Sequence, residues 1–319
     1  MNIDILERSD RYVLVSPCRD EAAFLRRCIE SVLGQTLRPA AWIIVDDGST
    51  DGSRQLLDEF SQKFPWMTVV TRVNRGSRSV GPGVVEAFEQ GLECVDLDQF
   101  EYLCKFDLDL VIPERYFETL VDRMTQDPRL GSCSGKPYCR VGDTLVAEKC
   151  GDEMSVGMTK FYRIECFRQI GGLVRCVMWD GIDCHRARMC GWIVASWDED
   201  ELRFEHLRAM GSSDRGLWRG RMRHGAGQYF MGTGFVYMFV SAIYRIAQRP
   251  YFIGSVAMIA GYVRSWWGRH PQYDDLGFRG FLSAYQRDCL LRGKRAATLR
   301  LDAQARLLHF KSGMWGSMR

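Results

Sequence analysis

The sequence predicts an α/β protein with a mostly parallel central sheet flanked by helices. Three short apolar runs, at 12–16, 41–45 and 67–71, have the length and β-branched content of buried strands. Each run is followed by apolar residues at helical spacing. The helical patterns cover residues 20–36, 55–64 and 84–92. Strands that alternate with helices at this spacing form βαβ units, whose ligands bind beyond the carboxyl ends of the strands.

The pattern becomes less regular after Pro113. The predicted elements there are a helix at 115–125, a strand pair at 130–141 and 146–153, a strand and helix within 159–172, and a last strand at 193–197. From about Ser212 the composition changes to Arg, Gly and aromatic residues. We therefore expect an α/β domain over 1–211 and a second region over 212–319.

Charge also divides the chain in two. Hydrophobic residues make up 46% of the 319 positions and charged residues 26%, as in an ordinary globular protein. The formal net charge of +3 combines −10 over residues 1–214 with +13 over 215–319. Such a basic region binds anions, for example phosphate, lipid headgroups or nucleic acid. We expect it to be helical and either to contact a membrane interface or to mediate oligomerisation.

Cysteine usage and the N-terminus indicate a reducing compartment. The twelve cysteines include no C-x-x-C pair, which argues against a zinc site. Cys28, Cys94 and Cys104 fall at positions that we expect to face the core, as small buried thiols do. The first residues contain no basic segment followed by an apolar one, so no signal peptide is expected. The predicted location is therefore the cytoplasm.

Two carboxylates follow the apolar run Tyr102–Phe106. If Asp107 and Asp109 continue this strand, they share one face and lie side by side. Adjacent carboxylates repel unless a cation lies between them, and Mg2+ and Mn2+ prefer oxygen ligands and often bridge to substrate phosphates. The stretch therefore predicts a metal site. The alternative is a strand that ends in two solvated acids.

Two more polar loops follow predicted strands, at Cys18–Glu21 and Asp46–Ser53. Because the carboxyl ends of parallel strands meet at one edge of a sheet, we expect these loops and Asp109 to converge on one crevice. Turn-forming residues fill the second loop. The alternative interpretation there is a helix start capped by Thr50 or Asp51.

These motifs, in this order, resemble those of the family 2 inverting glycosyltransferases, which have the GT-A fold. The matching stretches are VSPCRDE at 15–21, VDDGSTDGS at 45–53, FDLD at 106–109, and WDGID at 179–183 followed by Gly191-Trp192. The family usually has Asn where Asp20 stands and an acid where Trp179 stands. The resemblance covers about residues 12–210 and implies sugar transfer from a nucleoside-diphosphate sugar, with inversion and with Mn2+ or Mg2+.

The resemblance also implies roles for single residues, with a UDP-sugar as the expected donor. Asp180, twelve residues before Trp192, matches the family's catalytic base better than Asp183, the reserve candidate. Either acid could instead favour a helix start by its charge. Asp109 is the implied metal ligand, with Asp107 and His206 as further candidates. The candidate nucleotide-binding residues are Pro17, Asp20, Glu21, Asp46, Asp47 and Asp107.

Arginines after the resembling region are candidates for holding phosphate or acceptor, because a guanidinium suits phosphate. They are Arg219, Arg221 and Arg223. A solvated or lipid-facing surface explains them as well, and a structural role is the alternative for His206. The surrounding segment is loosely similar to the Q-x-x-R-W motif of processive members such as cellulose synthases. Trp218 and Met222 replace its Gln and Trp, so the chain is closer to non-processive enzymes of surface-polysaccharide assembly, with a glycan or polyprenyl-linked acceptor.

Two apolar segments, 235–244 and 251–263, are too short to span a bilayer. Apolar and aromatic residues beside arginine are typical of helices that lie in the headgroup region. We expect a peripheral anchor at the inner face of the cytoplasmic membrane. The alternative is a helical subdomain that packs on the sheet or on a second copy of the chain.

Three other functions would each explain part of the sequence. A sugar nucleotidyltransferase has a related fold but normally has a basic, Gly-rich phosphate loop after its first strand, where this chain has the acidic CRDE. A nucleic-acid-binding protein would explain the basic region but not the acidic loops at strand ends. A nucleotide-sugar binder without catalytic activity would share every motif, so only an assay separates it from the enzyme.

Overall fold

The computed structural model describes most of the chain as two compact units. The described residues are 11–76, 79–148, 150–208, 217–246 and 251–316, with backbone alone at 217, 251 and 308–316. The first unit comprises Met1–Arg78, Glu86–Gln169 and Ala195–Leu207, and the second comprises Ser79–Val85, Ile170–Val194 and Arg208–Arg319. The predicted boundary between residues 211 and 212, and the residues before 11 used to judge a signal peptide, lie outside the described residues.

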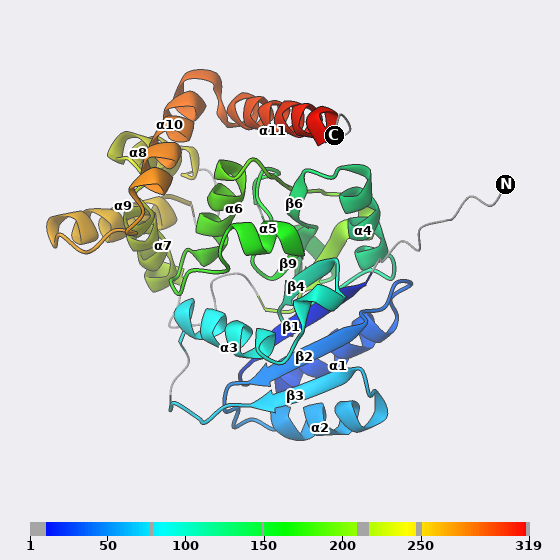
Figure 1. Ribbon diagram of the computed structural model, residues 1–319. Helices are drawn as coiled ribbons and strands as arrows, with labels where there is room; N and C mark the ends of the chain where they lie inside the picture. The colour runs from blue at the N-terminus through cyan, green and yellow to red at the C-terminus, as the bar shows by residue number, and fades with distance from the viewer. Residues whose placement is uncertain (1–10, 77–78, 149, 209–216, 247–250, 317–319) are drawn as a thin grey trace. The chain divides into compact units, whose positions relative to one another are not determined.

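A seven-stranded sheet confirms the predicted α/β fold (Figure 1). Its order is β10-β6-β9-β4-β1-β2-β3. The strands are β1 Tyr12–Cys18, β2 Ala41–Asp46, β3 Met67–Thr71, β4 Tyr102–Phe106, β6 Leu130–Ser134, β9 Thr159–Arg163 and β10 Ile193–Ser196. Strands β4, β1, β2 and β3 run parallel, whereas β9 is antiparallel to both β4 and β6. The three loops with polar motifs therefore follow adjacent parallel strands.

Helices cover both faces of this sheet. They are α1 Ala22–Leu33, α2 Ser53–Lys63, α3 Pro82–Leu92, α4 Tyr116–Gln126 and α5 Ile164–Gln169. Helix α3 packs directly on β1, because a Cβ at Gly91 would lie 2.5 Å from a methyl carbon of Val15. Successive strand residues point to opposite faces, so Tyr12 and Val15 face opposite sides. The ring centroid of Tyr12 lies 4.8 Å from that of Phe117 in α4, which places α3 and α4 on opposite faces.

Three local expectations were wrong. Strand β1 continues through Pro17 to Cys18, beyond the predicted run 12–16; β4 pairs with β1 only as far as Val15, so the missing N–H of Pro17 removes no ladder bond on that side. Helix α2 has Gly52 as its N-cap, at φ 92°, while Asp51 accepts a hydrogen bond from the Ser53 N–H. Cys94 is exposed because it follows the end of α3, whereas Cys28 and Cys104 are buried as expected.

A second, four-stranded sheet was not predicted as such. It has the order β5-β11-β7-β8, with β5 Leu110–Val111, β7 Lys136–Val141, β8 Thr144–Ala147 and β11 Arg203–His206. Strand β11 is antiparallel to β5 and parallel to β7, and β7 and β8 form a hairpin. These strands are short and mostly distant in sequence, so local periodicity does not reveal their pairing.

The second unit is helical, and two of its helices cross closely. Its helices are α6 Trp179–Met189, α7 Leu217–Met231, α8 Phe235–Tyr244, α9 Tyr251–Trp267, α10 Leu276–Arg292 and α11 Lys294–Gly316. A Cβ at Gly225 of α7 would lie 1.9 Å from the Met258 carbonyl oxygen of α9. A Cβ at Gly261 of α9 would likewise lie 2.0 Å from the Met222 carbonyl oxygen of α7. The missing side chains therefore allow the two backbones to touch.

We predict that Gly225→Ala lowers the free energy of unfolding by about 1–3 kcal/mol, because the added methyl group forces the α7 and α9 backbones apart. Thermal and urea unfolding of the full chain would measure the change. Gly280→Ala in the middle of α10 is the matched control, since its Cβ meets no atom within 4 Å. That substitution should leave stability unchanged or raise it by about 0.5–1 kcal/mol. Equal effects of the two substitutions would contradict the close crossing.

Candidate active site

Asp107 and Asp109 lie in the turn between β4 and β5. The expectation that they continue the strand was therefore wrong, since β4 ends at Phe106. The turn gives the two carboxylates different surroundings. Asp109 is only 7% exposed, and its carbonyl oxygen accepts a hydrogen bond from the Leu207 N–H at 2.8 Å.

The second sheet brings His206 to Asp109. Strand β11 pairs with β5 so that His206 lies opposite Leu110, the residue after Asp109. The Nε2 atom of His206 lies 3.6 Å from Oδ2 of Asp109. Two residues that the sequence proposed as metal ligands are thus adjacent, and both are buried.

Glu148 completes this cluster and was missed by the sequence analysis. It follows β8 directly, and its N–H donates to the Pro137 carbonyl oxygen at 2.9 Å. Its Oε2 lies 2.7 Å from Nδ1 of His206. Burial disfavours a charged His206, but the carboxylates of Asp109 and Glu148 outweigh burial and raise its pKa to about 9. The sequence analysis placed Glu148 inside the predicted strand 146–153, whereas the observed strand β8 ends at Ala147, so nothing in the sequence marked this acid as part of a site.

The chemistry of these side chains fits a divalent cation. A carboxylate and an imidazole are donors that Mn2+ accepts. Histidine ligands commonly give their other ring N–H to a carboxylate, and Glu148 is placed to receive it from His206. Across the described part of the chain, no group of three or more His, Cys, Asp and Glu residues is arranged to hold a metal by itself. Asp109 and His206 are two of the donors that such a cation would need.

Asp107 has a different partner. Its Oδ1 lies 2.5 Å from Nζ of Lys105, a buried lysine that also donates to the Gly157 carbonyl oxygen at 2.9 Å. Burial raises the pKa of Asp107. The positive charge of Lys105 opposes this and the negative charge of Asp109 adds to it, and the pKa is raised overall. An ammonium group already balances this carboxylate. Asp107 is therefore less suited than Asp109 to bind a cation.

Arginines surround Asp47 at the ends of β1, β2 and β3. Its Oδ1 lies 3.1 Å from Nη1 of Arg72 and 2.9 Å from Nη2 of Arg75. Nη1 of Arg19 donates to the Asp47 carbonyl oxygen at 2.5 Å, while the buried Nε of Arg19 makes no hydrogen bond. Asp47 is buried beneath this cluster. The arrangement offers both acceptors and donors to a polar ligand, and sequence reasoning did not identify the three arginines.

The other candidates of this loop shape its backbone. Asp46 accepts from the Ser49 N–H at 2.9 Å, and Asp20, at φ 54°, accepts from the Thr50 N–H at 2.7 Å. The backbone N–H of Glu21 donates to Oγ of Ser53 at 2.8 Å. Gly48 is required because its φ is 77° and a Cβ would lie 2.5 Å from Asn74. These hydrogen bonds fix the backbone of the loop, and Pro17 lies near the end of the preceding strand β1.

The remaining candidates belong to the second unit. Asp180 lies in the first turn of α6 and is partly exposed, whereas Asp183, one turn later, is only 2% exposed. Arg219, Arg221 and Arg223 lie on α7, where Arg219 is exposed and the other two are partly buried. Burial lowers the pKa of Arg221.

Comparison with known proteins points to one family. The sequence profile of glycosyl transferase family 2 matches residues 13–176. Glycosyltransferase GlyG of Streptococcus pneumoniae serotype 4 is 29% identical over 118 residues, which cover 37% of this chain and 36% of that protein. Poly-beta-1,6-N-acetyl-D-glucosamine synthase of Staphylococcus epidermidis is 26% identical over 132 residues, covering 41% and 29%. The chain thus spans about a third of the length of the curated relatives it matches.

The fold also resembles solved structures. The mannosyltransferase PcManGT from Pyrobaculum calidifontis, in complex with GDP-Man and Mn2+, superposes with a TM-score of 0.53. The match covers 93% of this chain and 86% of that one, at 16% sequence identity. At this identity the likeness shows a shared fold, which is the GT-A fold predicted from the motifs.

We predict that Glu148→Ala weakens Mn2+ binding about 10- to 100-fold, because His206 loses the carboxylate that orients its ring. Isothermal titration of the full chain with Mn2+ in the presence of UDP would measure the affinity. Glu148→Gln should lose less, since its amide oxygen still accepts from Nδ1. Glu165→Ala, which removes an exposed acid of α5, is the matched control. Unchanged affinity in Glu148→Ala would show that the contact plays no part in metal binding.

Proposed function

The chain belongs to glycosyl transferase family 2, and we propose that it transfers a sugar from a nucleoside-diphosphate sugar to a saccharide acceptor with inversion at the anomeric carbon. The observation that carries the proposal is the buried cluster of Asp109, His206 and Glu148 at the end of β4. It adjoins a sheet edge at which polar loops follow neighbouring parallel strands, where α/β folds bind ligands.

The loops at β1, β2 and β3 are the proposed nucleotide site. Asp47 accepts an N–H of the base, and the arginines around it donate to base carbonyl groups. Asp20 and Asp46 hold the shape of the loop by accepting hydrogen bonds from backbone N–H groups. Pro17, on β1, and Glu21, directly before α1, contribute through their positions in the backbone. UDP is the proposed nucleotide, with uracil N–H facing Asp47. Asp107, already balanced by Lys105, accepts from a ribose hydroxyl.

The diphosphate is the leaving group, and Asp109 and His206 are the proposed ligands of Mn2+ or Mg2+ beside it. When bound, the cation offsets the negative charge that grows on the diphosphate. Glu148 fixes the His206 ring so that Nε2 stays directed at Asp109. The protein supplies Asp109 and His206 as two buried ligands that are already oriented, so they need little reorganisation during the reaction.

Asp180 is the proposed general base. It takes the proton of the acceptor hydroxyl as that oxygen attacks the anomeric carbon, and the bond to the diphosphate breaks in the same displacement. A single displacement inverts the configuration. Partial exposure favours Asp180 over the buried Asp183, because the base must reach a substrate hydroxyl. Arg219, Arg221 and Arg223 are proposed to contact phosphate or acceptor groups.

The proposed process is the assembly of a cell-surface polysaccharide on a glycan or polyprenyl-linked acceptor at the inner face of the cytoplasmic membrane. The related poly-beta-1,6-N-acetyl-D-glucosamine synthase, by its name, makes a polysaccharide. The strongly basic C-terminal region supports a site near anionic lipid.

A panel of nucleotide sugars tests the proposal. Thermal-shift measurements with UDP-, GDP- and dTDP-sugars, each with and without Mn2+, should show a stabilisation that depends on both ligands. The donors that stabilise the chain are then assayed for transfer to saccharide acceptors, and the anomeric configuration of the product is read by NMR. Absence of any Mn2+-dependent nucleotide binding would contradict the proposal.

We predict that Asp109→Ala and Asp180→Ala each lower the turnover number by at least about 100-fold, for different reasons. Asp109→Ala should also weaken Mn2+-dependent binding of UDP, whereas Asp180→Ala should leave it unchanged. Steady-state kinetics and calorimetry separate the two effects. Asp122→Ala, at an exposed position of α4, is the control and should retain wild-type values.

If Asp180→Ala keeps most of its turnover while Asp183→Ala loses it, the base is Asp183. If both variants remain active, neither acid acts as the base and the proposed mechanism is wrong.

A further inference from the structure

Helix α8 exposes an apolar face. Of its ten residues, Met238 and Ala242 are buried. The large apolar residues of its other side recur at i, i+1, i+4, i+5, i+8 and i+9, which is one face of a helix. They are Phe235, Val236, Phe239, Val240, Ile243 and Tyr244. Their exposed fractions range from 45% for Val240 to 76% for Tyr244, far above what a core-facing side would show.

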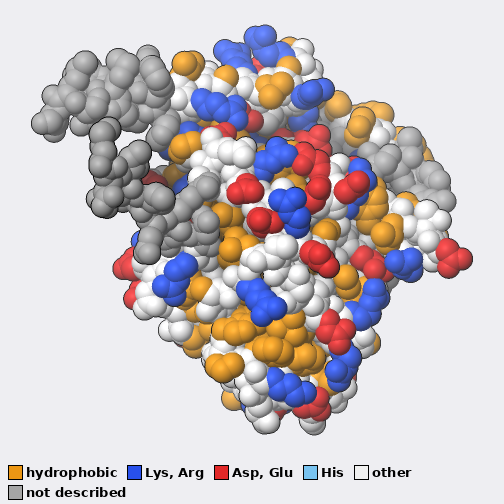
Figure 2. Space-filling model, turned by 90° about the vertical axis from the view of Figure 1, so that its right-hand side faces the viewer, with side chains coloured by type: hydrophobic (Ala, Val, Ile, Leu, Met, Phe, Trp, Pro, Cys, Tyr) orange, Lys and Arg blue, Asp and Glu red, His pale blue; other side chains and the backbone are white. Residues whose placement is uncertain are grey.

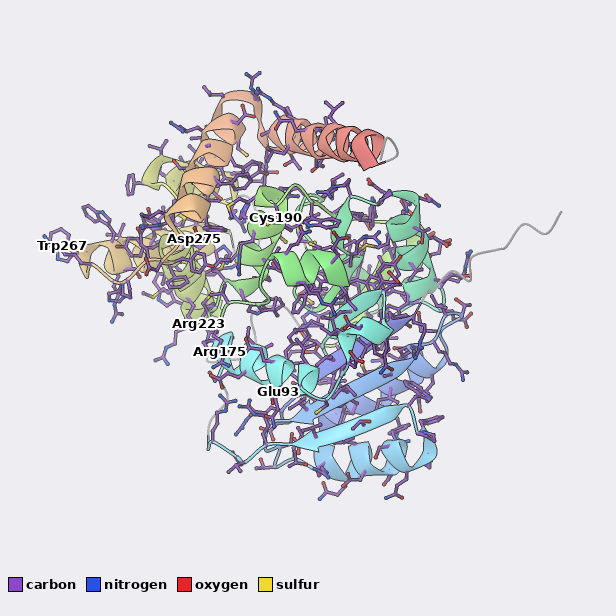
Figure 3. The ribbon with its side chains drawn as sticks, viewed as in Figure 1. Glu93, Arg175, Cys190, Arg223, Trp267 and Asp275 are labelled. Atoms are coloured by element: carbon purple, nitrogen blue, oxygen red, sulfur yellow. The ribbon has the colours of Figure 1, made fainter. Side chains whose placement is uncertain are left out.

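Helix α9 lies beside α8 and has an exposed apolar side of its own. The ring centroid of Phe235 lies 6.2 Å from that of Tyr262, so α8 and α9 lie side by side. One side of α9 carries three exposed apolar residues, which are Phe252, Val256 and Trp267. Trp267 is 81% exposed and lies at the free end of α9 (Figure 3). We call these residues, together with the exposed Trp266 and the six residues of α8, the α8–α9 face.

The charged side chains of the segment that forms this face are all positive. Between Asp214 and Asp274 the sequence contains eight arginines and neither Asp nor Glu. Arg264 and Arg269 are exposed beside the tryptophans at the end of α9. On the face that Figure 2 shows, by contrast, acidic and basic side chains are interspersed. An exposed apolar face bordered by arginine and tryptophan has the composition of a surface that meets lipid headgroups.

Charge argues against a second copy of the chain as the occupant. A symmetric contact would place the α8–α9 face against itself, and this segment offers no acid to pair with the arginines. Anionic phospholipid supplies both the missing negative charge and an apolar layer. Among the described helices, none is both long and apolar enough to cross a bilayer.

We propose that the α8–α9 face lies on an anionic phospholipid membrane. The apolar side chains of α8 and Phe252 of α9 enter the boundary between headgroups and acyl chains, with Trp266 and Trp267 at headgroup level. Arg264 and Arg269 contact lipid phosphates. The exposed fractions and charges behind this membrane contact all belong to the second unit. An error in the catalytic assignment would therefore leave the membrane contact unaffected.

Vesicle flotation of the full chain tests this surface. The vesicles contain phosphatidylcholine alone or with about a third phosphatidylglycerol. Wild-type chain should float with the anionic vesicles, and less of it in 0.5 M salt because screening weakens the arginine contacts. The double variant Phe235→Glu with Phe239→Glu should lower the partition coefficient at least about tenfold. Leu291→Glu with Leu299→Glu, at exposed positions of α10 and α11, is the matched control and should bind as wild type.

A second arm tests the charge. Arg264→Gln with Arg269→Gln should reduce flotation with anionic vesicles and leave the weaker binding to neutral vesicles unchanged. Circular dichroism establishes that each variant is folded. The proposal is wrong if wild-type chain does not float, or if the α8 variant floats as well as its control. It is also wrong if the α8 variant changes the molar mass in light scattering without changing flotation, because the face then binds a second copy.

Discussion

The pairing of the short strands β5 and β11 is the constraint on which the candidate site depends. This pairing sets His206 opposite Leu110 and therefore beside Asp109, although the two residues are far apart in the chain. Glu148, placed by the hairpin of β7 and β8, then fixes the imidazole from its other side. Without the second sheet, the motif after β4 would be two acids on an exposed turn. With it, one of those acids belongs to a buried cluster whose charges favour a cation.

The same turn gives different surroundings to two acids that the sequence cannot distinguish. Lys105 lies two residues before Asp107 and reaches its carboxylate, so a protein cation already occupies that position. Asp109 instead faces the imidazole of His206. The two acids of this short D-x-D stretch therefore have different partners, Lys105 for Asp107 and His206 for Asp109. The division follows from side-chain surroundings and not from spacing.

The parallel part of the fold was predictable because its signals are local. Apolar runs and helical periodicity revealed β1, β2 and β3 with the helices after them, and the turn residues of Asp46–Ser53 marked a loop at a strand end. The sequence could not reveal which distant strands pair, so Glu148 and the second sheet were missed. It also could not show that Arg72 and Arg75 converge on Asp47, because no periodicity links those positions. Cap residues were ambiguous for a similar reason: Asp51 is a good cap by composition, but its side chain binds Ser53 and the cap is Gly52.

In the proposed arrangement, Asp109 and His206 hold the cation while Glu148 orients the histidine. Anomalous diffraction at the manganese edge, from crystals of the full chain grown with UDP and Mn2+, tests it directly. We expect a manganese peak bound by the Asp109 carboxylate and Nε2 of His206, with Glu148 still on Nδ1. A manganese ion bound by Asp107 with His206 uncoordinated, or a bound diphosphate without manganese, would show that this arrangement is wrong.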